Sequence, residues 1–442
     1  MIKVSVPNIC QPEIKYTIDC LLSDFLGLTY EIIIDANQKD FAFFIGKQSL
    51  RIKNHFFDSN DITELYRFNR IPESIDTGEI TIGNSVHTIN TIYGTTKLEK
   101  RDNQYNLDAD IISSTFFMLS RWEEKACRER DNHNRFDEDF ALAIKQNFFD
   151  KPIVNEYVDL LYSALLSIGL RQKKKQQQYT PILSHDIDYI KKWKHFSSLI
   201  NESKKNIKKR QFLRIPLNLG SFFFSKIQLI NDPYDNLIWL SEIAKRKGVL
   251  STFYFMSGIS NSKYDQVDYD LSSKKMRSIV DKLLDNGCKV GLHPSYESYL
   301  SKDVMTKEVR SINLSIDMEI EESRQHYLRI QIPETFRILE DLGINYDSSL
   351  LYGKNIGFRN GVCYDFPIFD ILERRKMKII ERPLIFMENH HLNTDRAIMH
   401  LKFKQVIDRV KYFEGSALIL WHNSNLDSKE RKRQFLDFID LL

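Results

Sequence analysis

The chain has 442 residues, of which 42% are hydrophobic and 12% aromatic; this composition is that of a globular protein and excludes global disorder. Its 63 basic residues nearly balance 60 acidic ones, so the net charge of +3 gives no reason to expect nucleic acid as the main partner. Basic clusters at residues 173–175 and 204–210 are interpreted as solvated linker and loop charge. The length favours two domains.

Cysteine usage and the N-terminus indicate the compartment. The five cysteines are scattered, odd in number and without a Cys-x-x-Cys pair, which argues against a zinc ribbon or a disulfide framework. Residues 1–8 lack the charged start and long apolar core of a secretory signal. No apolar run is long enough to span a bilayer. We therefore expect a cytoplasmic protein without a transmembrane segment.

Residues 1–168 predict a smaller α+β domain. An amphipathic helix pattern at 13–26 is followed by strand-like runs at 30–34 and 41–45, a hairpin that turns at Gly83-Asn84, and helices at 111–125 and 154–165. Residues 169–179 then read Gly-Leu-Arg-Gln-Lys-Lys-Lys-Gln-Gln-Gln-Tyr, a polar stretch of low complexity. We interpret this stretch as a linker.

From residue 180 to 442 the pattern alternates between strands and helices. Strands are predicted at 180–184, 251–255, 289–292, 327–330, 346–348, 379–382 and 417–421, and helices at 233–247, 273–286, 302–323, 333–342 and 397–413. Gly248 and Gly287 are expected to end two of these helices. Such alternation predicts an α/β domain with a parallel sheet or barrel. Residues 195–231 form an insertion that we expect to be a helical pair or a lid.

Polar side chains gather where the predicted strands end. Asp186 and Asp188 close the run Pro-Ile-Leu-Ser-His-Asp-Ile-Asp, and residues two apart on a strand point to the same side. Two adjacent acids are costly unless a cation, an arginine or a reaction uses them, although Asp-x-Asp is also common in surface turns. His293 and His422 follow other strands, and His326 lies beside a third. In parallel barrels such positions form one site.

The order of these motifs resembles the polysaccharide deacetylase family (NodB-like, carbohydrate esterase family 4). That family has an acid pair on its first strand, then a His motif, an Arg-Pro-Pro-Tyr-like loop and a late Leu-x-His. The similarity covers about residues 180–425. It implies a distorted (β/α) barrel of the NodB deacetylase type, preceded here by the α+β domain as an accessory domain.

The resemblance also implies a metal site. Asp188 corresponds to the metal-binding aspartate and His293 to the first metal histidine. The second histidine of the family falls at Glu297, which is a departure. His326 replaces a proline of the family loop, and either His326 or Glu297 is expected to complete the site.

Catalytic roles carry over in the same way. Asp186 corresponds to the general base, although the residue that separates it from Asp188 leaves their roles open to exchange. Arg324 would orient that base, and the backbone N–H of Tyr327 would face the oxyanion. His422 corresponds to the late histidine that acts as general acid.

These residues predict a metal-dependent hydrolase that removes N-acetyl or O-acetyl groups from an amino sugar in a polysaccharide or its precursor. A divalent metal polarises the carbonyl and acidifies water, a carboxylate takes the proton, and an imidazolium protonates the departing amine. Mixed Asp/His ligands favour zinc, with cobalt, nickel or manganese tolerated. Two alternatives remain: a catalytically inactive sugar-binding or scaffold protein, and another metallohydrolase such as a phosphoesterase.

Overall fold

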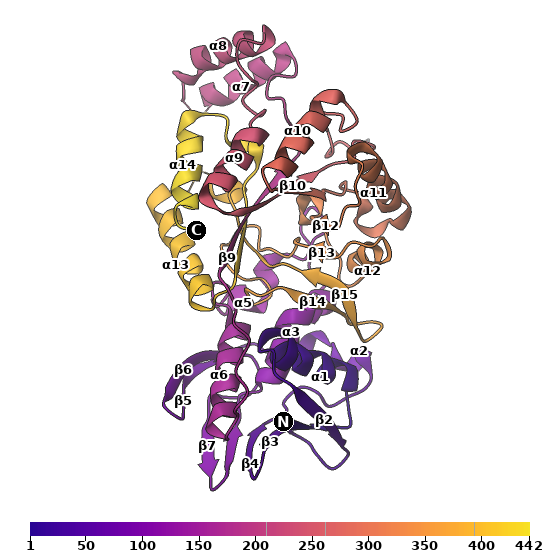
Figure 1. Ribbon diagram of the computed structural model, residues 1–442, viewed down its shortest axis with the longest axis vertical. Coiled ribbons are helices and arrows are strands. Elements are labelled where there is room, and N and C mark those ends of the chain that lie inside the picture. The colour runs from indigo at the N-terminus through magenta and orange to yellow at the C-terminus, as the bar shows by residue number, and fades with distance from the viewer. Residues whose placement is uncertain (209, 261, 393) are drawn as a thin grey trace. The chain divides into compact units, whose positions relative to one another are not determined.

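The computed structural model describes residues 1–208, 210–260, 262–392 and 394–442. The chain forms two compact units (Figure 1). Unit 1 comprises Met1–Tyr179, Leu328–Ile385 and Asp408–Ser416, and unit 2 comprises Thr180–Tyr327, Phe386–Ile407 and Ala417–Leu442. The change from unit 1 to unit 2 after Tyr179 falls at the end of the predicted linker. The predicted domain boundaries themselves stay a prediction.

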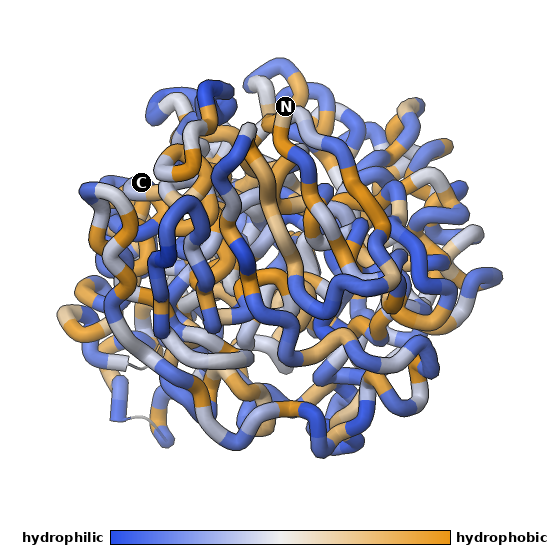
Figure 2. Tube along the Cα trace, turned by 90° about the horizontal axis from the view of Figure 1, so that it is seen from below, coloured by the Kyte–Doolittle hydropathy of each residue, from blue (hydrophilic) through white to orange (hydrophobic). Residues whose placement is uncertain are grey.

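Unit 1 is a mixed α/β structure. Its strands are β1 (Ile2–Pro7), β2 (Tyr30–Asp35), β3 (Phe41–Ile45), β4 (Gln48–Ile52), β5 (Asp76–Ile82), β6 (Ser85–Thr91), β7 (Leu98–Arg101), β8 (Gln104–Leu107), β13 (Tyr346–Asp347), β14 (Phe366–Asp370) and β15 (Arg375–Glu381). Its helices are α1 (Gln11–Ile18), α2 (Ile62–Leu65), α3 (Ile111–Ser120), α4 (Trp122–Ala126), α5 (Leu142–Lys145), α6 (Ile153–Ser167) and α12 (Glu334–Asp341). Six strands form a sheet in the order β2-β1-β3-β4-β8-β7, and β5 pairs with β6. Figure 2 shows hydrophobic and hydrophilic stretches alternating along the chain near the N-terminus.

Most predicted elements of the N-terminal region are confirmed. β3 has the predicted bounds, and the pairing of Ile82 with Ser85 places the hairpin turn at Gly83-Asn84. The helix predicted at 111–125 is interrupted at Arg121, which has a left-handed φ of 52° between α3 and α4. The buried Arg121 guanidinium forms ion pairs with Glu123 at 2.5 Å and Glu124 at 2.8 Å. These local contacts offset the cost of the left-handed backbone.

Six strands of a nine-stranded sheet lie wholly or partly in unit 2, together with several helices. Its strands are β9 (Thr180–Ile187), β10 (Leu250–Phe255), β11 (Lys289–Leu292) and β12 (Glu322–Ser323). Its helices are α7 (Phe196–Lys208), α8 (Arg214–Lys226), α9 (Leu237–Lys247), α10 (Lys274–Asp285), α11 (Lys302–Ile316) and α14 (Lys429–Ile439). Residues of both units belong to β16 (Leu384–Met387), α13 (Arg396–Tyr412) and β17 (Ser416–Leu420). The strand order is β12-β11-β10-β9-β17-β16, and β9 to β12 are parallel.

Helix ends in unit 2 follow the predicted chemistry. Gly248 caps α9 with a φ of 65°, and Gly287 follows α10 with a φ of 79°, a left-handed backbone that glycine adopts without a Cβ clash. The insertion is a helical pair, α7 and α8. The predicted α/β class is confirmed at this level, and the barrel type stays a prediction. Among the described residues, we find no helix with the length and apolar character needed to cross a bilayer.

One predicted strand is wrong. Residues 327–330 do not form a strand, because Tyr327 and Leu328 have left-handed φ angles of 59° and 53°, which a strand cannot contain. The strand at this place is β12, which ends four residues before Tyr327 and pairs with β11 through Ser323 and Leu292. The helix predicted at 302–323 is correspondingly shorter and ends at Ile316. The consequence for function is that Arg324 and His326 follow a strand end.

The parallel register aligns three side-chain positions across the sheet. Asp186 on β9 lies opposite Tyr254 on β10, and Tyr254 lies opposite Gly291 on β11. A Cβ at Gly291 would come within 2.6 Å of the Tyr254 ring and within 2.9 Å of the Glu322 carbonyl oxygen. The Tyr254 ring therefore packs against Gly291, in space that any larger residue at position 291 would occupy.

We expect Gly291→Ala to lower the free energy of unfolding by about 1–3 kcal/mol, because the added methyl must displace a packed ring and a backbone carbonyl. Urea denaturation measures the change. Gly220→Ala in α8 is the control, since its nearest neighbour, Phe224, is 3.8 Å from the added carbon and alanine favours helices. Equal stability of Gly291→Ala and wild type would contradict this account of the packing.

Candidate active site

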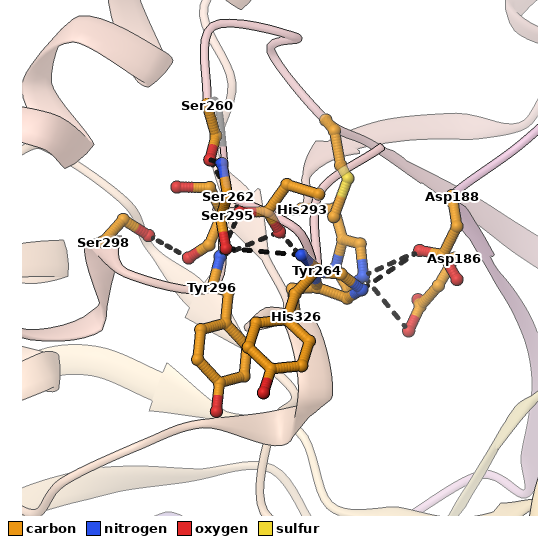
Figure 3. A network of polar contacts seen from close by, with 12 residues as sticks. Asp186, Asp188, Ser260, Ser262, Tyr264, His293, Ser295, Tyr296, Ser298 and His326 are labelled. Atoms are coloured by element: carbon orange, nitrogen blue, oxygen red, sulfur yellow. Dashed lines mark hydrogen bonds and ion pairs between the residues drawn. The ribbon is translucent and has the colours of Figure 1, made fainter. Parts of the chain in front are cut away.

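The acid pair lies at the end of β9. Asp186 is the penultimate residue of the strand, and Asp188 follows its last residue. Figure 3 shows both carboxylates directed toward the imidazoles of His293 and His326. Unit 2 thus brings together the four residues that the sequence placed at three separate strand ends.

His293 leaves β11 with one ring nitrogen already engaged. Its Nδ1 lies 2.6 Å from the backbone carbonyl oxygen of Arg324, and because a carbonyl only accepts, Nδ1 donates there. Nε2 is then the atom that faces the acids, 3.5 Å from Asp188 Oδ1 and 3.8 Å from Asp186 Oδ2. A histidine oriented in this way by its other nitrogen is typical of a metal ligand.

His326 is oriented by a carboxylate that the sequence did not predict. Its Nδ1 lies 2.7 Å from Asp265 Oδ1, and its Nε2 lies 3.7 Å from Asp188 Oδ1. Asp265 is buried and is itself held by the backbone N–H of Tyr296 at 3.0 Å and by the Ser260 hydroxyl at 2.7 Å. This carboxylate–histidine arrangement fixes the orientation of the His326 ring and directs its Nε2 toward Asp188.

These atoms fit a divalent cation. One ligand atom each from Asp188, His293 and His326 lies within 4.8 Å of the others. Asp188 Oδ1 is buried and has no hydrogen-bond partner, a costly state that a cation would relieve. Zinc bonds of about 2.0–2.2 Å in tetrahedral geometry place neighbouring ligand atoms a little over 3 Å apart. The distances from Asp188 Oδ1 to the two imidazole nitrogens, 3.5 and 3.7 Å, are close to this spacing.

The charges at this cluster support the same interpretation. Burial raises the pKa of the Asp188 carboxyl, but the close approach of His293 and the charge of His326 outweigh burial and hold that pKa well below its usual range. Burial lowers the pKa of His293, and the carboxylates of Asp186 and Asp188 more than offset this and raise it. A metal ion would compete with a proton for the same His293 nitrogen.

Arg324 lies beside Asp186, as predicted. The guanidinium is fully buried, and its Nη1 donates to the Ser184 hydroxyl at 2.6 Å and to Asp186 Oδ1 at 3.2 Å. The same guanidinium stacks on the Tyr254 ring, 4.5 Å from its centroid. Asp186 therefore has one oxygen bound to arginine and the other, Oδ2, turned toward His293.

His422 follows β17 and is paired with Glu388, which follows β16. Its Nδ1 lies 2.9 Å from the buried Glu388 Oε1, and its backbone N–H donates to the same oxygen at 2.8 Å. Burial lowers the pKa of His422, but the charge of Glu388, with those of Asp188 and Asp186, outweighs burial and raises the pKa to about 10. The imidazole is thus charged at neutral pH, with Nε2 as the nitrogen that can donate.

Two other predicted residues have different surroundings. Glu297 is exposed and is not part of the cluster found among the described residues, so the expectation that it ligates the metal is not supported. It lines a surface pocket with α11 residues such as Lys307 and Arg310. Tyr327 is 37% exposed, and its ring lies edge-on to that of His326. The role of its backbone N–H stays a prediction.

The sequence assigned no role to two carboxylates that bind histidines of the candidate site, Asp265 and Glu388. Glu388 carried the same signal as the acid pair, because it follows the apolar run Leu384–Met387 at a strand end. Asp265 had no such signal, since it lies in the irregular segment between β10 and α10 and reaches His326 only through tertiary structure.

Comparisons with known proteins give a family match for the N-terminal part alone. Residues 2–169 match a family of unknown function (DUF7033). No curated protein sequence matches the chain.

Solved structures are similar to part of the chain, at low identity. A protein from Mycobacterium smegmatis assigned as a polysaccharide deacetylase is 13% identical, with a TM-score of 0.37, and the alignment covers 60% of this chain and 85% of that chain. A family 4 carbohydrate esterase from Streptomyces lividans is 9% identical, with a TM-score of 0.30, and the alignment covers 60% of this chain and 88% of that chain. A CE4 family pseudoenzyme from Bacillus anthracis is 10% identical, with a TM-score of 0.28, and the alignment covers 60% of this chain and 61% of that chain.

We expect Asp265→Asn to weaken zinc binding by about 10–100-fold, because it removes the charge that orients His326 without touching a ligand atom. Competition with a chromophoric chelator measures the affinity. Asp270→Asn, which alters an exposed carboxylate in the same segment, should bind zinc like wild type. Wild-type affinity in Asp265→Asn would mean that His326 is not a ligand or does not need this carboxylate.

Proposed function

We propose that the chain is a metal-dependent hydrolase that removes N-acetyl or O-acetyl groups from an amino sugar in a polysaccharide or its precursor. One observation carries the proposal: Asp188 Oδ1 accepts no hydrogen bond and lies close to both His293 Nε2 and His326 Nε2, with the carboxylate of Asp186 near His293. The motif order shared with polysaccharide deacetylases supports the substrate class.

Asp188, His293 and His326 are the residues that would hold the ion. When bound, zinc would supply polarisation of the acetyl carbonyl and acidification of water, the two effects that an unreactive amide most needs. Cobalt, nickel or manganese would suit the same mixed Asp/His ligands.

Asp186 serves as the general base. Its Oδ2 faces the cluster, so it takes a proton from the water that attacks the acetyl carbon. Arg324 is a positioning residue, because it binds the opposite oxygen of the same carboxylate and prevents the side chain from rotating away. The backbone N–H of Tyr327 is the proposed donor to the oxyanion that develops on the acetyl oxygen.

His422 serves as the general acid. With Nδ1 bound to Glu388, its Nε2 carries the proton that passes to the nitrogen or oxygen of the departing sugar. Without that proton the leaving group would depart as an anion of high energy. Glu388 keeps the imidazole both charged and oriented, which is the role of the third member of a catalytic triad.

We expect Asp186→Asn to lower acetate release from N-acetylated amino sugar oligomers by about 10²–10⁴-fold while zinc content stays stoichiometric, since the base is lost and the ligands remain. Chelation should abolish wild-type activity, and added zinc should restore it. Asp270→Asn, an exposed aspartate of the same unit, should behave as wild type.

The same assays separate the alternatives. A sugar-binding scaffold would bind the oligomers without releasing acetate and need not hold stoichiometric metal. A phosphoesterase would hydrolyse p-nitrophenyl phosphate and leave the acetyl groups intact. Full acetate release by Asp186→Asn would show that the base has been assigned to the wrong residue.

We expect Glu388→Gln to move the alkaline limb of the pH profile of kcat/KM to lower pH. The general acid is active only while protonated, and the charge of Glu388 is the largest influence that raises the pKa of His422 toward about 10. With that charge removed, the proton is lost at lower pH and activity falls earlier. Glu319→Gln, at an exposed position, is the control. An unchanged alkaline limb would exclude His422 as the group that controls it.

A further inference from the structure

The insertion of unit 2 is a helical hairpin with very little core of its own. α7 and α8 lie at one end of unit 2 (Figure 1). A cluster of only three buried side chains, Trp193, Leu199 and Phe222, joins them. The Trp193 Nε1 donates to the Ser221 hydroxyl at 3.0 Å. This core contains one apolar side chain from each helix, Leu199 and Phe222, so the other apolar side chains of the two helices lie outside it.

Many of those side chains are exposed on α8. Leu217, Leu219, Phe223 and Phe224 are 70%, 45%, 53% and 50% exposed, and Leu213 just before the helix is 85% exposed. Spacings of four and seven residues place Leu213, Leu217 and Phe224 along one side of the helix, opposite the buried Phe222. Leu219 and Phe223, four residues apart, lie along a neighbouring side. A helix that only had to remain in water would carry polar residues on this side.

α7 adds an apolar line bordered by lysines. Phe196, Ile200 and Ile207 are 57%, 43% and 53% exposed and share one side of the helix by their spacing. Lys204 and Lys208 are exposed on the adjacent side. Over residues 190–231 the sequence has ten lysines and arginines and one acid, Glu202.

We infer that this hairpin docks on the surface of an anionic lipid bilayer. Exposed aromatic and aliphatic side chains bordered by lysines and arginines are the pattern of helices that lie in the interface of a membrane, where the apolar side enters the acyl boundary and the cations meet lipid phosphates. α8 has 13 residues and is about 20 Å long, whereas the hydrocarbon core is about 30 Å thick. The hairpin therefore lies on the bilayer and does not cross it.

Charge complementarity distinguishes this partner from others. A second copy of the chain would bring the same excess of positive charge to the contact, and the two faces would repel each other. Nucleic acid would satisfy the lysines but would leave Leu213, Leu217 and Phe224 in water. An anionic bilayer satisfies both kinds of side chain. This inference does not depend on the proposed hydrolase activity.

Co-sedimentation of the full chain with vesicles tests the inference. We expect binding to phosphatidylcholine vesicles that contain phosphatidylglycerol, little binding to phosphatidylcholine alone, and weakening as salt is raised. Both Leu213→Ser/Leu217→Ser and Lys204→Glu/Lys208→Glu should lower the partition coefficient at least about tenfold. Matched controls are Leu314→Ser/Leu401→Ser, at positions 74% and 57% exposed on other helices, and Lys402→Glu/Lys404→Glu on α13. They should stay within about twofold of wild type.

Three outcomes would overturn the inference. The first is absence of binding to the anionic vesicles, or equal binding of the hairpin variants and wild type. The second is a concentration-dependent dimer, seen by light scattering and dispersed by Leu213→Ser/Leu217→Ser, without vesicle binding. The third is tight binding of single- or double-stranded nucleic acid that depends on Lys204 and Lys208 but not on Leu213 and Leu217. Circular dichroism of each variant checks that helix content is retained.

Discussion

A buried carboxylate oxygen without a hydrogen bond is the constraint on which the candidate site depends. Asp188 Oδ1 lies 3.5 Å from one imidazole nitrogen and 3.7 Å from another, too far for either to satisfy it directly. Both imidazoles are held in place from behind, His293 by a backbone carbonyl and His326 by Asp265. The neighbours thus hold three candidate ligand atoms within 4.8 Å of one another, an arrangement that could hold a metal ion.

The sheet itself determines the position of Asp186, the proposed general base. Gly291, Tyr254 and Asp186 lie in register on adjacent strands, and the absence of a Cβ at Gly291 leaves room for the tyrosine ring. That ring supports the buried Arg324 guanidinium, which in turn binds Asp186. Gly291, two strands away, therefore influences the orientation of the Asp186 carboxylate through the packing of the Tyr254 ring and the hydrogen bond from Arg324.

Sequence patterns predicted those parts of the site that are set by strand ends. Asp186, Asp188, His293 and His422 follow or close apolar runs, and the parallel sheet brings such ends together. What the sequence could not predict depends on tertiary contacts: Asp265 reaches His326 from an irregular segment. The strand expected at 327–330 failed because apolar β-formers there adopt a left-handed turn that only the fold imposes. Propensity describes local preference, and this turn is a place where tertiary structure overrides it.

The net charge of the whole chain likewise gave no indication of the basic hairpin, because it averages over segments of opposite charge. The whole chain carries a net charge of +3, yet residues 190–231 have ten basic residues and one acidic residue, so the remainder of the chain is net acidic. Near an anionic surface such a charge distribution attracts the hairpin and repels the rest, which orients the molecule before any apolar side chain inserts. A lysine-rich segment alone is explained by solvation. The additional observation that excludes this simpler reading is structural, because Leu213, Leu217, Phe223 and Phe224 remain exposed beside those lysines after the hairpin has folded. Water solvates the lysines and arginines by themselves. The exposed rings beside them are stabilised only on a surface that is both charged and apolar.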